Sequence, residues 1–170
     1  QKWKLIPANR RPNLWDTSLR VPTAIRWPGT ITPGTKISQT VSNLDWFPTV
    51  LAMAGVVLPK DIVIRGRDFT PLLRGQEVDW DNDLYAEYSM KYGATTHMRG
   101  WRTVRWKYTI DFASPGREEL YDLGSNPEET INLAHSTEPQ HVRVRKVLGG
   151  KIRIRMKENA DSVALKSSDR

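Results

Sequence analysis

The feature that most constrains the fold is a change of hydrophobic pattern at an acidic stretch, residues 79–83. Upstream of it, apolar residues from Phe47 to Ala54 recur at the i, i+3, i+4 and i+7 spacing of an amphipathic helix. Downstream of it, residues 84–123 form short runs rich in aromatic and β-branched residues, separated by Gly and Pro, as in antiparallel strands. The sequence therefore predicts two parts of different architecture that meet near residue 79.

The second part is expected to contain a small antiparallel sheet. Gly100 and the segment 114–116 supply breaks between its strands. The predicted strands are residues 84–89, 95–99, 102–111 and 119–123. In the first part, the apolar run 21–27 predicts one more short strand, and residues 71–74 predict a short helix that Gly75 ends.

The excess of basic residues lies near the C-terminal end. Residues 141–157 contain seven Lys or Arg and no Asp or Glu, whereas the rest of the chain has equal numbers of basic and acidic residues. Two structures fit this segment. Its alternation of apolar and basic residues around Gly149 and Gly150 predicts a hairpin, and an i+4 stripe from Val144 to Met156 predicts a helix. The residues alone leave both open.

Residue types that carry catalytic or metal chemistry are sparse. The absence of Cys excludes disulfides, thiolate metal sites and a cysteine nucleophile within these 170 residues. The three His lack metal-ligand spacing, and the alternating Asp residues of 79–83 lack the Gly and distal Glu of a calcium loop. We therefore expect no metal site in this segment. No run of about 18 apolar residues occurs, so no membrane-spanning helix is expected.

Six segments carry short motifs, among them Arg-Val-Pro, Trp-Pro-Gly, Glu-Leu-Tyr-Asp-Leu and Asn-Pro-Glu-Glu. The segments are Leu14–Pro22, Arg26–Gly29, Val41–Gly55, Arg65–Gly75, Arg102–Tyr108 and Glu119–Ala134. In this order they resemble the C-terminal part of the sulfatase family. Each motif is short, and the specificity of the resemblance comes from their number and order.

The resemblance implies an α/β fold similar to that of alkaline phosphatase. Residues 1–78 would complete the large catalytic α/β domain. Residues 79–170 would form a small C-terminal α+β subdomain of four antiparallel strands packed by a terminal helix. Because the family ends in a helix packed on the small sheet, the resemblance favours helix over hairpin for residues 141–157.

The function that the resemblance implies is that of a sulfuric ester hydrolase, similar to arylsulfatases. Such enzymes use a formylglycine nucleophile made in a Cys/Ser-x-Pro/Ala-x-Arg motif, and they bind Ca²⁺. Neither that motif nor the calcium ligands occur here, so we expect both upstream and expect this segment alone to be inactive. The implied partners are the N-terminal part of the same protein and a sulfated small molecule or glycan. A periplasmic or secreted location is implied, and neither nucleic acid nor membrane is expected as a partner.

One catalytic candidate follows from the resemblance. Sulfatases place a sulfate-binding Lys four residues before the aromatic residue of the first motif. That aromatic is Trp15 here, and Arg11 holds the Lys position. An arginine can bind two sulfate oxygens at once, but it cannot readily donate a proton to a leaving group. The candidate substrate-binding residues are Arg10, His97 and Arg99.

Two rival functions remain at this level. One is a non-catalytic module that binds polyanions through the basic residues 141–157, although a solvated helix face is the plainer interpretation of that charge. The other is a related metal-dependent phosphoesterase, which the Arg-Val-Pro and Glu-Leu-Tyr-Asp-Leu motifs disfavour.

Overall fold

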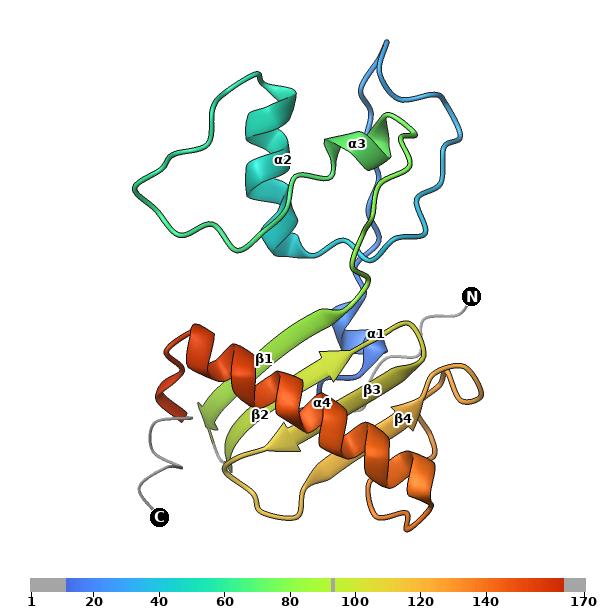
Figure 1. Ribbon diagram of the computed structural model, residues 1–170, viewed down its shortest axis with the longest axis vertical. Coiled ribbons are helices and arrows are strands. Elements are labelled where there is room, and N and C mark those ends of the chain that lie inside the picture. Colours follow the sequence, from blue (N-terminus) through green and yellow to red (C-terminus); the bar gives the residue numbers. More distant parts are fainter. Residues whose placement is uncertain (1–11, 93, 164–170) are drawn as a thin grey trace. The chain divides into compact units, whose positions relative to one another are not determined.

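The computed structural model describes residues 12–92 and 94–163, which form two compact units (Figure 1). Residues 12–22 and 83–163 form the sheet unit, and Thr23–Asn82 form the loop-rich unit. The short segment 12–22 therefore belongs, by its contacts, with the sheet that follows it far along the chain. The division into a catalytic-domain end at 1–78 and a subdomain at 79–170 stays a prediction.

The sheet unit is built on a four-stranded antiparallel sheet in the order β1-β2-β3-β4. The strands are β1 (Leu84–Tyr92), β2 (Ala94–Arg102), β3 (Trp106–Asp111) and β4 (Glu118–Asp122). The register places Trp101 opposite Tyr108, and Tyr108 opposite Leu120, so these side chains share one face. The predicted small antiparallel sheet is confirmed.

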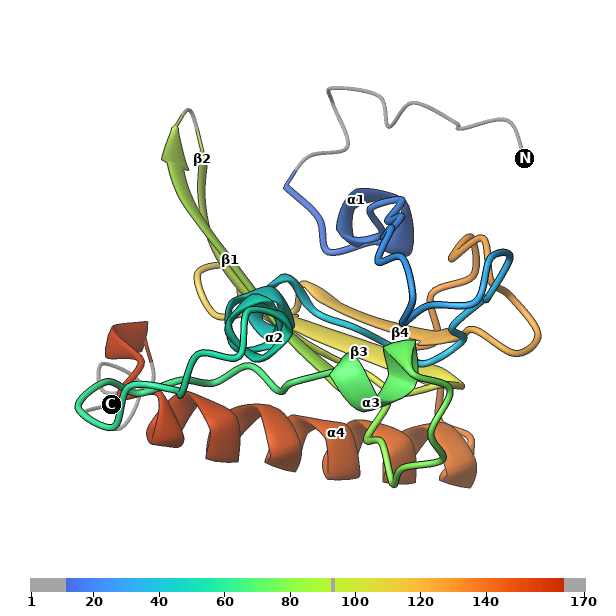
Figure 2. The ribbon, with the colours of Figure 1, turned by 90° about the horizontal axis from the view of Figure 1, so that it is seen from above.

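Helices lie on both faces of this sheet. The long helix α4 (Pro139–Glu158) crosses one face, and the short helix α1 (Asp16–Leu19) lies on the other (Figure 2). The core under α4 consists of Trp101, Tyr108, Ile110, Leu120, Ala134, Leu148, Ile152 and Met156. Burying a Leu, Ile or Met side chain contributes roughly 1.5–3 kcal/mol, which offsets the cost of two helix-interior glycines at about 1 kcal/mol each. The segment is therefore a helix, and the hairpin alternative is wrong.

Gly100 does not have the role that the sequence predicts for it. It lies inside β2, and the turn between β2 and β3 falls at residues 103–105. A Cβ atom at Gly100 would lie 3.1 Å from Leu14 Cδ1 and 3.2 Å from Thr109 Oγ1. The glycine therefore allows the N-terminal segment to approach the sheet closely, and it does not break the strand.

The loop-rich unit has a smaller core around Phe69, which is 2% exposed and packs edge-on against Trp46 with ring centroids 5.3 Å apart. Its helices are α2 (Trp46–Met53), preceded by the 3₁₀ turn η2 (Asn43–Asp45), and α3 (Thr70–Leu73). The strand predicted at 21–27 is wrong. Ile25 and Trp27 instead reach the Phe69 core from irregular backbone.

Candidate functional site

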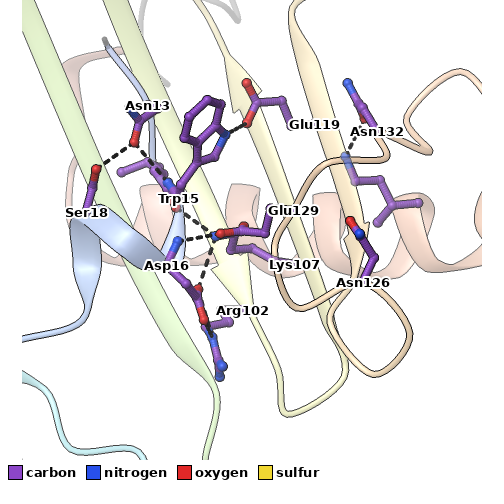
Figure 3. Close-up of polar contacts among 12 residues, drawn as sticks. Asn13, Trp15, Asp16, Ser18, Arg102, Lys107, Glu119, Asn126, Glu129 and Asn132 are labelled. Atoms are coloured by element: carbon purple, nitrogen blue, oxygen red, sulfur yellow. Dashed lines mark hydrogen bonds and ion pairs between the residues drawn. The ribbon is translucent and has the colours of Figure 1, made fainter. Parts of the chain in front are cut away.

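The face of the sheet opposite α4 holds a buried lysine at the centre of a polar cluster. Lys107 follows Trp106 in β3, so its side chain points away from the α4 core and is 2% exposed. Its Nζ atom donates to the Leu14 carbonyl at 2.9 Å and to Asp16 Oδ1 at 3.1 Å. It also forms an ion pair with Glu129 (Figure 3). A charge buried this deeply persists only with such partners.

Asp16 joins the cluster from the opposite side. Arg102 Nε lies 3.1 Å from both of its carboxylate oxygens. The backbone N–H of Asp16 donates to Glu129 Oε2 at 2.6 Å. Two carboxylates and two cations thus meet within one network, which we call the Asp16–Lys107 cluster, and its formal charges balance (Figure 3).

The two carboxylates of the cluster respond differently to their surroundings. Burial by itself raises the pKa of Asp16, but Lys107 and then Arg102 outweigh it, so that pKa lies below its ordinary value. Burial raises the pKa of Glu129 above its ordinary value, because Lys107 offsets the desolvation only in part. As pH falls, Glu129 is therefore protonated before Asp16.

The loop that carries Glu129 is fixed at several points. Glu129 has a φ of 53°, a left-handed conformation that is uncommon for a residue other than Gly. Asn126 Oδ1 accepts hydrogen bonds from the backbone N–H groups of Thr130 and Ile131 at 2.8 and 3.1 Å. Asn132 bridges to β4 by accepting from Leu120 N at 3.0 Å. The Asn-Pro-Glu-Glu motif therefore shapes a loop that delivers Glu129 to Lys107.

The segment leading into α1 has further anchors on the sheet. Arg117 donates to the Pro12 carbonyl and is paired with the buried Asp111 at 3.1 Å. The Trp15 indole N–H donates to Glu119 Oε2 at 3.2 Å. Because Pro12 itself is buried, the chain is held from residue 12 onward.

The Asp16–Lys107 cluster is suited to holding structure together rather than to chemistry. Each charged group in it already has an opposite charge in contact, and none is free to act as a nucleophile or base. Among residues 12–92 and 94–163, no group of three His, Asp or Glu is placed to hold a metal ion. The residues described here therefore do not fit a calcium site. Within the same residues, no helix is long and apolar enough to cross a membrane.

The residues proposed from sequence for the site are only partly placed by the structure. Arg10 and Arg11 lie outside the described residues. Arg99, 3% exposed, binds Asp161 through Nε at 2.6 Å and Nη2 at 3.1 Å, and its Nη1 donates to Ser89 Oγ at 3.0 Å. His97 Nδ1 contacts the same hydroxyl at 3.1 Å. These two residues thus meet at Ser89, and their role in substrate binding stays a prediction.

Sequence reasoning missed the residues of the Asp16–Lys107 cluster. All of them lie inside the motifs quoted above, but none was given a role. One signal was available for Lys107, which stands between Trp106 and Tyr108 in a strand whose residues 107–111 are all buried. A lysine in such a strand requires a buried partner.

The meander of four strands, the packed terminal helix and the clamped N-terminal segment define the C-terminal part of an α/β sulfatase fold. The chain matches the family of N-sulphoglucosamine sulphohydrolase C-terminal domains over residues 9–158. It belongs to this family of sulfatase C-terminal domains.

Three relatives illustrate the likeness. The chain is 33% identical to steryl-sulfatase of Rattus norvegicus over 156 residues, which are 77% of this chain and 27% of that protein. It is 29% identical to the ulvan-active sulfatase of Formosa agariphila over 158 residues, 75% of this chain and 31% of that protein. The solved structure of BT4656 in complex with its substrate D-glucosamine-2-N,6-O-disulfate superposes with a TM-score of 0.64 at 27% identity, covering 81% of this chain and 28% of that one. The chain thus spans less than a third of each relative.

Proposed function

We propose that this chain is the C-terminal part of an enzyme that hydrolyses sulfate esters. The observation that carries the proposal is that the Asp16–Lys107 cluster joins three of the six segments that resemble sulfatases. Asp16 comes from the first segment, Arg102 and Lys107 from the fifth, and Glu129 from the sixth. Asp16 and Lys107, 91 positions apart in the sequence, are thus joined in one structural unit.

In this proposal the chain supports the substrate pocket, and the reacting groups come from elsewhere in the protein. The formylglycine nucleophile and the Ca²⁺ ligands would lie upstream, since the described residues do not fit a metal site. A periplasmic or secreted location and a sulfated small molecule or glycan as substrate belong to the same proposal. The comparisons give no support to a binding module that lacks a catalytic partner.

The proposal is tested by comparing the 170-residue chain with the whole protein on a chromogenic aryl sulfate. We expect turnover by the whole protein and none by the chain alone. The matching aryl phosphate distinguishes the rival phosphoesterase. A whole protein whose kcat/KM is higher for the phosphate ester than for the sulfate ester would contradict the proposal.

Arg11 is proposed as the residue that binds the sulfate group in the whole enzyme. Two observations support this role. Arg11 lies four residues before Trp15, and the next residue, the buried Pro12, is held to the sheet because Arg117 donates to its carbonyl. Loss of a charge-assisted contact of about 1.5–3 kcal/mol should lower kcat/KM about tenfold or more in Arg11→Ala. Arg11→Lys should retain more activity because it keeps the charge. Arg10→Ala tests the rival candidate, and a larger loss of kcat/KM there would assign the sulfate-binding role to Arg10.

A further inference from the structure

The outer face of α4 carries a strip of positive charge. Arg143, Lys146, Arg153 and Lys157 are all exposed. On a helix of 3.6 residues per turn they fall within about 80° of arc and extend over about 21 Å of the axis. The buried residues Leu148, Ile152 and Met156 occupy the opposite side of the helix, against the sheet. We call these four exposed residues the cationic strip.

The cationic strip has no acidic partners within the part of the chain that the structure describes. The flanking cations do have them, because Lys151 pairs with Asp83 at 2.7 Å and Arg155 pairs with Glu158 at 3.0 Å. Arg153 donates to the carbonyl of Gly149 at 3.3 Å, and this contact does not neutralise its charge. Like charges three or four residues apart repel along a helix. A bound polyanion would remove that repulsion.

Gly150 lies in the middle of the cationic strip and has no packing role on the protein side. Apart from its chain neighbours and the adjacent backbone of α4 itself, nothing in the described chain lies within 4 Å of the position that its Cβ would take. Its neighbour Gly149 differs, because a Cβ there would lie 3.4 Å from the Tyr108 ring and 3.2 Å from Arg153. A glycine inside a helix is unfavourable, and one use for it is the close approach of a ligand to the backbone. Val147 and Ile154, 53% and 60% exposed, add apolar surface beside it.

We infer that the cationic strip, with Gly150 at its centre, is an accessory binding surface for a sulfated polysaccharide. The inference rests on the proposed function, since a sulfate ester hydrolase that acts on a polymer meets a chain of sulfate groups. A linear row of unpaired cations matches such a linear polyanion in charge and shape. Val147 and Ile154 offer contact to the apolar faces of sugar rings, and the absence of a side chain at Gly150 lets a ring come close to the helix backbone.

The test measures binding of heparin, a sulfated polysaccharide, to the 170-residue chain at several salt concentrations. Replacing all four residues of the cationic strip by Gln should weaken binding about tenfold or more and reduce the slope of log K against log salt by about 3. The control variant carries Arg26→Gln, Lys36→Gln, Lys60→Gln and Lys91→Gln, which remove the same charge from exposed positions elsewhere. It should bind within about twofold of the unmodified chain.

A second variant, Gly150→Leu, leaves every charge in place and adds a side chain at this position. It should weaken heparin binding about threefold or more while circular dichroism shows an intact helix. The inference would be overturned if the variant with four Gln in the cationic strip and the control variant lost heparin affinity equally. The absence of heparin binding by the unmodified chain would also overturn it. Equal affinity for desulfated heparin or for duplex DNA would overturn the assignment to sulfated glycans. None of these outcomes bears on aryl sulfate turnover by the whole protein, which tests the proposed function separately.

Discussion

Lys107 illustrates how a single residue decides whether two distant segments stay on the sheet. It is the common partner of Leu14, Asp16 and Glu129, which lie on either side of it in the sequence. Without its charge, Asp16 keeps Arg102 as a partner, but Glu129 has no cation left among the contacts of the cluster. Burying a carboxylate without a cation is energetically unfavourable, so removing Lys107 should lower the free energy of unfolding by more than any one of its contacts contributes.

We expect Lys107→Met to lower the free energy of unfolding by about 3–5 kcal/mol, the usual cost of breaking a buried ion pair from one side. Urea denaturation followed by tryptophan fluorescence measures it. Arg105→Met is the matched control, because Arg105 pairs with Asp122 from an exposed position and should change stability little. Similar losses in the two variants would contradict a structural role for the cluster.

The lowered pKa values of four aspartates in the sheet unit indicate that its stability falls in acid. The pKa values of Asp16, Asp111, Asp122 and Asp161 lie below their ordinary value, and that of Glu129 lies above it. A carboxyl with a lowered folded-state pKa stabilises the fold above its unfolded-state value, and this stabilisation is lost as pH falls through the folded-state value. Since the four aspartates outnumber Glu129, which acts in the opposite direction, stability should fall below about pH 4.

Urea midpoints measured between about pH 7 and about pH 2 test this expectation. The hydrogen bonds from Arg99 are the main cause of the lowered pKa of Asp161. Asp161→Asn should therefore reduce the fall of the urea midpoint at low pH. The exposed Asp61 provides the control, and Asp61→Asn should leave the profile unchanged. A flat profile in the unmodified chain would show that these aspartates do not govern its stability.

At the scale of elements, the two adjacent glycines of α4 have different surroundings. Gly150 faces open space, and Gly149 lies against Tyr108 and Arg153. Gly150→Ala should therefore raise the free energy of unfolding by about 1 kcal/mol through helix propensity alone. Gly149→Ala should gain less, because its methyl group must displace the Arg153 side chain. Thermal unfolding by circular dichroism compares the two, and a larger gain at Gly149 would contradict the packing described here.

Local pattern was sufficient to predict most elements of the sheet unit. The four strands follow from periodicity, because one buried face imposes it. Periodicity left residues 141–157 open between helix and hairpin, and only the family resemblance favoured the helix α4. The position of Gly100 did not follow, since a glycine that breaks a strand and one that admits a neighbouring segment look alike in sequence. The pairing of Lys107 with Asp16 and Glu129 could not be predicted from the sequence pattern either. A contact between residues 113 positions apart, such as that of Asp16 with Glu129, leaves no periodic signal.

At the scale of the whole molecule, the sheet unit is assembled from two stretches of chain. Residues 12–22 cover one face of the sheet formed by residues 84–122, so a piece beginning at residue 79 lacks that cover. Lys107, 2% exposed, would then lose the Leu14 carbonyl and Asp16 that bury and pair it. The sheet unit therefore includes residues from both sides of position 79.

We expect the 79–170 piece to unfold at a lower temperature than the sheet unit of the intact chain, because it loses both apolar burial and the partners of Lys107. Adding a peptide of residues 12–22 should raise its melting temperature, as a ligand that binds only the folded state does. The same peptide with Asp16→Asn should raise it less. A 79–170 piece as stable as the intact chain would contradict the role of the N-terminal segment.

The contact between Asp16 and Glu129 also sets a limit on the order of events during synthesis. The two residues are 113 positions apart, and at about 5–20 residues per second a ribosome needs about 6–23 s to make the intervening chain. During that interval the first segment has no sheet to bind. Closing so long a loop is also entropically unfavourable until the contacts at its ends have formed. The sheet unit can therefore complete its fold only after Glu129 has been made, and its apolar faces stay accessible to chaperones until then.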